Sequence, residues 1–86
     1  GVQTIADELK ISNNYLSAIF KQHVGISFTS YLTKVRLAKA KELIEQSLLK
    51  IHDIAILVGY EDHNYFSRVF RREYGISPSE IREVHR

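Results

Sequence analysis

The stretch HNYFSRVFRREYGIS at residues 63–77 decides the fold, because it repeats NNYLSAIFKQHVGIS at residues 13–27. Seven of the fifteen aligned positions carry the same residue, and most of the others exchange chemically similar ones. A clear exception is Arg68, which stands where the first copy has Ala18. Two copies of one pattern in so short a chain predict two copies of one structural unit, each with its own variable positions.

The composition limits what the chain can be. Its 86 residues make one small domain or two half-domains, and the lack of cysteine excludes disulfides and thiolate metal sites. The sequence has no apolar run of about eighteen residues and no signal-peptide layout, so we expect a cytoplasmic protein with no membrane partner. The net charge of +2 and the pI near 9.0 permit an acidic partner such as nucleic acid without requiring one. Because Gly1 directly precedes a helical pattern, we expect the chain to be a piece of a longer protein.

Helix breakers are few. Pro78 is the only proline, glycine occurs only at positions 1, 25, 59 and 75, and no strand-like alternation is present, which together predict an all-α fold. A short helix carrying Val2, Ile5, Ala6 and Leu9 is followed by helices at about 12–23, 28–46, 53–57 and 62–74 and by one that opens at Pro78. The expected helix signals are Ser12, Asp62 and Ser77 as N-caps, Glu80 completing a capping box with Ser77, and Gly25 and Gly75 as helix ends.

Apolar spacing predicts which helix faces are buried. The candidates are Leu16, Ile19 and Phe20 in the first copy, Phe66, Val69 and Phe70 in the second, and Phe28, Leu32, Val35, Leu43 and Ile44 in the long helix. A short helix, a tight turn and a longer helix form the helix-turn-helix layout. The chain therefore divides into a first subdomain at 1–27, a linker helix at 28–46 and a second subdomain at 47–86.

The outer face of each longer helix is polar and lacks acidic residues. Asn64, Ser67, Arg68 and Arg71 follow the i, i+3, i+4, i+7 spacing of one helix face, and Asn14, Ser17, Ala18 and Lys21 match them in the first copy. An ordinary solvated helix face usually mixes glutamate with its lysine and arginine. The repeated acid-free face therefore favours insertion into the DNA major groove, which admits one α-helix.

The linker length agrees with this interpretation. Two such helices on one face of B-DNA must lie about 34 Å apart, which is one turn of the duplex. A helix of roughly nineteen residues spans about 28 Å, and the width of the flanking helices adds to this length. One chain could thus replace a dimer of single helix-turn-helix proteins.

The segments IADELKISNNYLSAIFKQHVGISFTSYL, RLAKAKELI and IAILVGYEDHNYFSRVFRREYGISPSEIR together resemble the AraC/XylS family of bacterial transcription regulators. The resemblance spans essentially the whole chain. It implies sequence-specific binding of double-stranded DNA for transcription regulation, no enzymatic activity, and two helix-turn-helix subdomains in adjacent major-groove segments. It implies base-reading positions at Asn14, Ser17, Ala18, His63, Asn64, Ser67 and Arg68, and phosphate contacts at Ser12, Lys21, Arg36, Arg71 and Arg72.

The same resemblance extends to partners. Relatives of this kind carry an attached sensor or receiver domain, which this chain lacks, and RNA polymerase is an expected partner. A weaker resemblance points to regulators of two-component systems. Family members usually have one further helix before the first motif. Lys10 also departs from the second copy, which has Gly59 there, so the first motif is expected to be less stable.

Other functions fit the sequence less well. His23, His52, His63 and His85 are scattered over different elements, and no glycine-rich phosphate loop or Ser-His-Asp arrangement is present, so no metal, cofactor or catalytic site is expected. Tyr15 and Tyr65 are interpreted as partly buried packing residues rather than base-stacking platforms. The alternative function is a helical protein-interaction module that recruits RNA polymerase or a regulatory partner and touches DNA only weakly.

Overall fold

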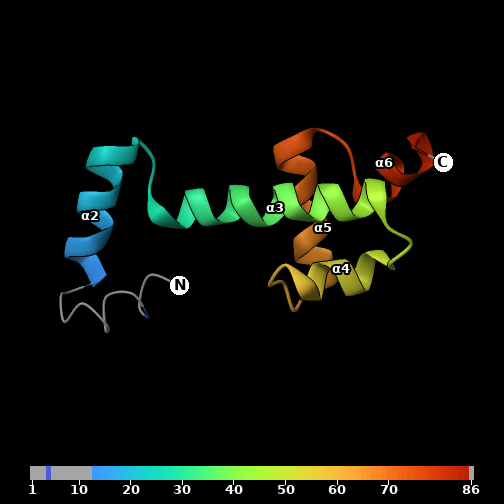
Figure 1. Cartoon of the computed structure of the whole chain (residues 1–86), viewed down its shortest axis with the longest axis horizontal. Coiled ribbons are helices and arrows are strands. Elements are labelled where there is room, and N and C mark those ends of the chain that lie inside the picture. Colours follow the sequence, from blue (N-terminus) through green and yellow to red (C-terminus); the bar gives the residue numbers. More distant parts are fainter. Residues whose placement is uncertain (1–3, 5–12, 86) are drawn as a thin grey trace. The chain divides into compact units, whose positions relative to one another are not determined.

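The computed structural model describes Thr4 and residues 13–85. Their helices are α2 (Asn13–Val24), α3 (Phe28–Gln46), α4 (Ile51–Leu57), α5 (His63–Tyr74) and α6 (Pro78–Val84), with no strand in the described part of the chain (Figure 1). The all-α prediction is therefore confirmed. The expected first helix, the Ser12 cap and the turn at Lys10 lie outside the described residues.

The chain divides into two compact units, residues 1–33 and 34–86. The boundary falls inside α3, so residues 28–33 of this helix belong to the first unit. No helix in the described part of the chain combines the length and the apolar character needed to cross a membrane.

A single hydrophobic core holds the second unit together. Phe66 and Phe70 of α5 are completely buried, as the apolar spacing predicts, and Val69 is only 7% exposed. The remaining core residues come from α3, α4, α6 and the turn before α5: Leu37, Ala40, Ile44, Ile54, Ala55, Val58, Tyr60 and Ile81. The other three helices of the unit thus fix the position of α5 by burying its apolar side.

Local capping signals set the ends of α5. The Asp62 carboxylate accepts hydrogen bonds from the backbone N–H groups of Asn64 at 2.9 Å and Tyr65 at 3.1 Å. Gly75 ends the helix with a φ of 75°, a left-handed conformation that residues with a Cβ adopt only at a cost. Both predicted ends of α5 are confirmed.

Helices α4 and α6 differ in detail from the predictions. Helix α4 begins at Ile51, two residues before the predicted start. Its N-cap residue, Lys50, provides no side-chain cap, so no local sequence signal marks this helix start. At α6, the Ser77 hydroxyl accepts the Glu80 N–H at 3.1 Å, which is one half of the capping box. The other half is not formed: the Glu80 carboxylate lies 3.9 Å from Nη1 of Arg71 instead.

The sequence repeat is reproduced in the backbone where each copy turns. Gly25 donates its N–H to the Lys21 carbonyl at 2.8 Å, and Gly75 donates to the Arg71 carbonyl at 2.7 Å. In the first copy the Ser27 hydroxyl accepts the Ser30 N–H at 3.0 Å, as Ser77 does for α6. The shared sequence Gly-Ile-Ser therefore forms the same connection in both copies, in which the glycine ends one helix and the serine caps the next.

The buried stripe of α3 differs from the predicted one. Val35 is 47% exposed, whereas Leu37 and Ala40, which the apolar spacing did not single out, are fully buried. Ile44 is buried as predicted, and Leu43 is partly buried against the core. A helix with apolar residues on several sides has no single face that periodicity can select, so the position of α4, α5 and α6 decides which residues are covered.

Arg82 joins α6 to the end of α3. Its guanidinium donates to the carbonyl oxygens of Ile44 at 3.3 Å and Ser47 at 3.3 Å, and also to that of Leu49. These carbonyls lie in and just after the last turn of α3, where backbone carbonyls have no hydrogen-bond partner within the helix. The side chain therefore caps α3 from a helix that follows it by more than thirty residues.

Candidate nucleic-acid interface

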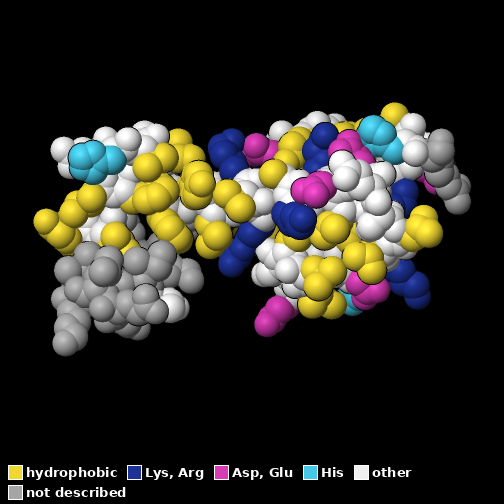
Figure 2. Space-filling view, in the orientation of Figure 1, with side chains coloured by type: hydrophobic (Ala, Val, Ile, Leu, Met, Phe, Trp, Pro, Cys, Tyr) yellow, Lys and Arg dark blue, Asp and Glu magenta, His cyan; other side chains and the backbone are white. Residues whose placement is uncertain are grey.

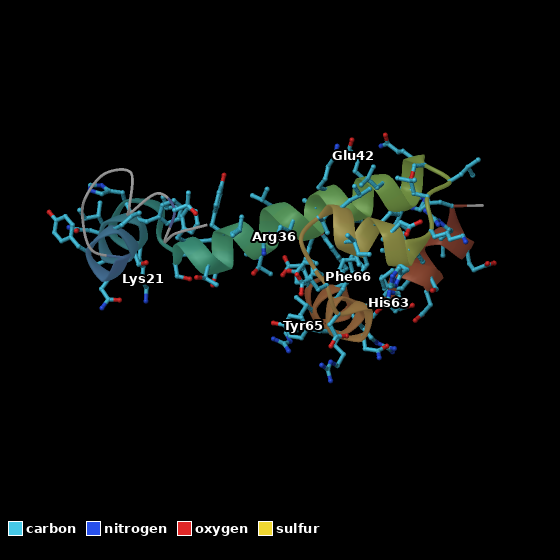
Figure 3. The ribbon with its side chains drawn as sticks, turned by 90° about the horizontal axis from the view of Figure 1, so that it is seen from below. Lys21, Arg36, Glu42, His63, Tyr65 and Phe66 are labelled. Atoms are coloured by element: carbon cyan, nitrogen blue, oxygen red, sulfur yellow. The ribbon has the colours of Figure 1, made fainter. Side chains whose placement is uncertain are left out.

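The exposed side of α5 carries most of the candidate interface. Its exposed residues are Asn64, Tyr65, Arg68, Arg71, Arg72 and Glu73, and Glu73 is the only acid in the helix. In Figure 3, Phe66 lies on the side of α5 that faces α3 and α4, and Tyr65 lies on the outer side. The three arginines and Asn64 thus form a donor-rich surface.

Little negative charge opposes these arginines. The Glu73 carboxylate is occupied by Lys34 of α3, with 3.1 Å between Nζ and Oε1. Arg71 lies 3.9 Å from Glu80, but both side chains are largely exposed, so this ion pair is weak. Arg68 has no carboxylate partner among residues 4 and 13–85. The cationic groups of α5 therefore remain available to an anionic ligand.

The predicted base-reading residues of α5 fall into two groups. Asn64 and Arg68 are exposed, whereas Ser67 and His63 are half-buried at the edge of the outer face. The His63 ring lies 5.7 Å from the His52 ring, and its Nδ1 is buried without a hydrogen-bond partner in the described part of the chain. No three His, Cys, Asp or Glu side chains of the described residues are grouped as a metal site requires.

Helix α2 presents the corresponding face of the first unit. Asn14, Ala18 and Lys21 are exposed, and Ser17 is half-buried. On the inner side, Phe20 packs edge-on against Phe28 with ring centroids 5.1 Å apart. The predicted outer and inner sides of α2 are therefore distinct in the structure, although only one of its outer residues carries a full charge.

Basic side chains are also visible on the surface of the second unit. On its face shown in Figure 2, Lys and Arg side chains lie over α3 and the elements that follow it. In the last turn of α5, burial raises the pKa of the Tyr74 phenol, and the Glu73 carboxylate adds to the rise. Tyr74 therefore stays neutral and adds no charge to this surface.

Arg36 contacts the turn that precedes α5. Its side chain is half-buried, and its guanidinium carbon lies 6.0 Å from the centre of the Tyr60 ring (Figure 3). Gly59, in the same turn, has a φ of 106°, and a Cβ at this position would lie 3.1 Å from both Cζ and Nε of Arg36. Arg36 thus packs on the helix-turn-helix turn, a contact that the sequence pattern did not predict.

Both tyrosines of the repeated NY pairs are more exposed than predicted. Tyr15 is 59% exposed and Tyr65 is 49% exposed. The reason is geometric: each tyrosine precedes a position that faces the interior, and one residue along a helix turns the side chain by about 100°. Their rings therefore lie beside the outer residues of α2 and α5 rather than inside the units.

Residues 5–83 match the family described as a helix-turn-helix domain. The chain belongs to the AraC-type helix-turn-helix family. This AraC-type domain is 42% identical over 81 residues to the transcriptional activator RhaR of Pectobacterium carotovorum, which corresponds to 94% of the chain and 28% of RhaR. The chain thus spans less than a third of that relative. The family consists of transcription regulators, in agreement with the expected lack of enzymatic activity.

Solved structures resemble the AraC-type domain closely. The C-terminal domain of AraT, a response regulator from Geobacillus stearothermophilus, is 43% identical with a TM-score of 0.92, over 98% of this chain and 69% of that one. The DNA-binding domain of AdpA, solved in complex with a target DNA, is 26% identical with a TM-score of 0.91, over 100% and 78% of the two chains. The fold of two helix-turn-helix motifs is therefore shared with this family.

Proposed function

We propose that this AraC-type domain binds double-stranded DNA sequence-specifically and thereby regulates bacterial transcription. The observation that carries the proposal is the outer face of α5, where Asn64, Arg68 and Arg71 are exposed and the single acid of the helix, Glu73, is paired with Lys34. A donor-rich helix face of this kind suits the acceptor-rich major groove and its phosphates. The DNA complex of the similar AdpA domain supports the proposal.

The two units would each place one helix in the groove. We assign α2 and α5 to adjacent major-groove segments, within the predicted subdomains 1–27 and 47–86 and with the linker helix 28–46 setting their spacing. The support is the common design of the two copies, which share the glycine and serine connection described above. The DNA sequence that is bound would then be asymmetric, because the outer residues of α2 and α5 differ.

Separate roles follow from side-chain chemistry. Arg68 is the proposed guanine reader, since its guanidinium can bond O6 and N7 together, and Asn14 is the proposed adenine reader. Ala18 can offer only apolar contact, for example to a thymine methyl group. The full proposed sets are Asn14, Ser17, Ala18, His63, Asn64, Ser67 and Arg68 for bases, and Ser12, Lys21, Arg36, Arg71 and Arg72 for phosphates.

The protein from which this domain comes would act in the cytoplasm, with a sensor or receiver domain elsewhere in its chain and RNA polymerase as a partner. Two comparisons support the further domain. The chain spans only 28% of RhaR, and the similar AraT domain belongs to a response regulator. Mass spectrometry of RNA polymerase complexes formed on the target duplex would test the polymerase contact.

Salt dependence tests the DNA proposal directly. A target duplex would first be selected from a random pool, and its dissociation constant measured by fluorescence anisotropy over a range of salt concentrations. A reader that neutralises several phosphates should lose affinity steeply, with a log–log slope of about −0.9 per phosphate. Arg71→Ala should weaken all duplexes alike and reduce the slope by about one, whereas Arg68→Ala should cost about 1–3 kcal/mol at one base pair.

One observation favours the alternative of a protein-interaction module. Several large apolar side chains of the second unit are exposed, among them Leu48 at 101%, Leu57 at 65% and Val84 at 74%. A partner that covers them would explain their exposure. The same titration decides between the two functions, because absence of duplex binding at low salt with an intact helical fold would leave only the interaction module.

A further inference from the structure

We propose that Tyr65 is a positioning residue for Arg68: its ring, supported by Tyr60, holds the Arg68 guanidinium on one side of α5 and so sharpens the reading of one base pair. The inference rests on the proposed function, in which Arg68 reads a base. It adds a residue that the sequence pattern assigned to packing. The contacts that carry it lie entirely within the second unit.

Tyr65 is held in place from below. Its ring lies 6.0 Å from the ring of Tyr60, with 47° between the ring planes. Tyr60 is only 9% exposed and packs against Phe66 at 5.5 Å, while Arg36 lies over it at 6.0 Å. The outer ring of Tyr65 therefore rests on a residue that belongs to the core of the unit.

Arg68 lies on this supported ring. Its guanidinium carbon is 5.9 Å from the centre of the Tyr65 ring, one helical turn further along α5. This distance is within the range of a cation–π contact. Since Arg68 has no carboxylate partner among the described residues, no ion pair competes with the Tyr65 ring for its orientation.

The contact matters because arginine is long and flexible. A side chain that is already restricted in the free protein loses less entropy when it docks on a base edge. A guanidinium held on one side of α5 also reaches fewer neighbouring acceptors, so the wrong base pair is rejected more strongly. In the first copy Tyr15 is followed, three positions on, by Ala18, which has no charge to position.

A first test needs no DNA. In the 86-residue chain, a ring next to the guanidinium should shift the NMR signals of the Arg68 Cδ protons upfield through its ring current. Tyr65→Phe should keep this shift, and Tyr65→Leu and Tyr65→Gln should abolish it. A normal Arg68 Cδ shift in the parent chain would overturn the inference whatever the DNA experiments show.

A second test measures specificity. Dissociation constants are determined for the selected duplex and for duplexes with each single base-pair change, using the parent chain, Arg68→Ala, Tyr65→Leu and the double variant. Tyr65→Leu should reduce discrimination about two- to fivefold at the base pair read by Arg68. It should have no further effect when Arg68 is already alanine. Tyr65→Phe should behave as the parent chain, and the control Tyr15→Leu should leave discrimination at that base pair unchanged.

The outcomes separate the two proposals. If Arg68→Ala relaxes one base pair but Tyr65→Leu weakens every duplex alike, Tyr65 contacts DNA itself and the positioning role is wrong. If Tyr65→Phe behaves like Tyr65→Leu, the hydroxyl rather than the ring is responsible, with the same conclusion. If Arg68→Ala changes no base-pair preference, both the base-reading assignment and the inference fail. Tyr65→Gln provides a second ring-free variant, and melting curves confirm that each variant is folded.

Discussion

Gly59→Ala should destabilise the second unit by more than the backbone conformation alone requires. Gly59 has a φ of 106°, where a residue with a Cβ costs about 1–2 kcal/mol. The new methyl group would also lie 3.1 Å from Cζ and Nε of Arg36, which must move and give up part of its contact with the Tyr60 ring. Because the whole contact is worth about 0.5–1 kcal/mol, its partial loss leads us to expect a total of about 1–3 kcal/mol.

Urea titration followed by circular dichroism would measure this loss as a change in the free energy of unfolding. Gly75→Ala is the matched control, because Gly75 has a φ of 75° and no neighbouring atom within 4 Å of the added Cβ. It should show the conformational cost alone, about 1–2 kcal/mol. The decisive comparison is Gly59→Ala in an Arg36→Ala background, where the crowding has been removed.

In that background Gly59→Ala should cost less than in the parent chain, by up to about 1 kcal/mol, as expected for residues in contact. An equal cost in both backgrounds would refute the idea that Arg36 presses on the turn. A Gly59→Ala variant as stable as the parent chain would refute the positive φ as well, because alanine would then be accommodated without strain.

Three further changes test the packing of the second unit, and one tests the first. Phe66→Ala should lower the free energy of unfolding by about 3–5 kcal/mol in urea titrations, since the ring is fully buried, and Phe66→Leu should cost less. Arg82→Lys should have a melting temperature nearly as low as that of Arg82→Ala, because an ammonium group cannot replace a planar guanidinium that donates to several carbonyl oxygens. Full rescue by lysine would contradict this prediction. Asp62→Ala should cost about 1 kcal/mol through loss of the α5 cap, and Asp62→Asn should restore most of it. Lys10→Gly should raise the melting temperature if the first copy turns as the second does, and no gain would count against that prediction.

Helix ends could be predicted from the sequence where a local side chain determines them. Asp62 and Gly75 mark α5 correctly, because an N-cap and a left-handed C-cap act within a few residues of their own position. Helix α4 starts earlier than predicted, since Lys50 provides no such signal. The outer and inner faces of α5 were also predictable, as apolar and polar residues separate cleanly around that helix.

Contacts between distant elements could not be predicted in this way. The burial of Leu37 and Ala40 instead of Val35 depends on where the other helices lie against α3. The family resemblance implies only a phosphate contact for Arg36, and it is the fold that brings this side chain to a turn more than twenty residues away. No sequence signal marks the contacts of Arg82, because binding to backbone carbonyls requires no particular residue type in the partner.

The link from Arg82 to α3 has a consequence for synthesis on the ribosome. The N-terminal part of a chain generally emerges and folds first. Here α5 is synthesised before Ile81 and Arg82. Until α6 has been made, the buried side of α5 lacks its packing against Ile81, and the end of α3 lacks the Arg82 cap. A chain truncated between residues 75 and 80 would therefore carry the arginine-bearing helix without the support that orients it. The core of the second unit and the cap of α3 are thus completed together, when α6 has been added.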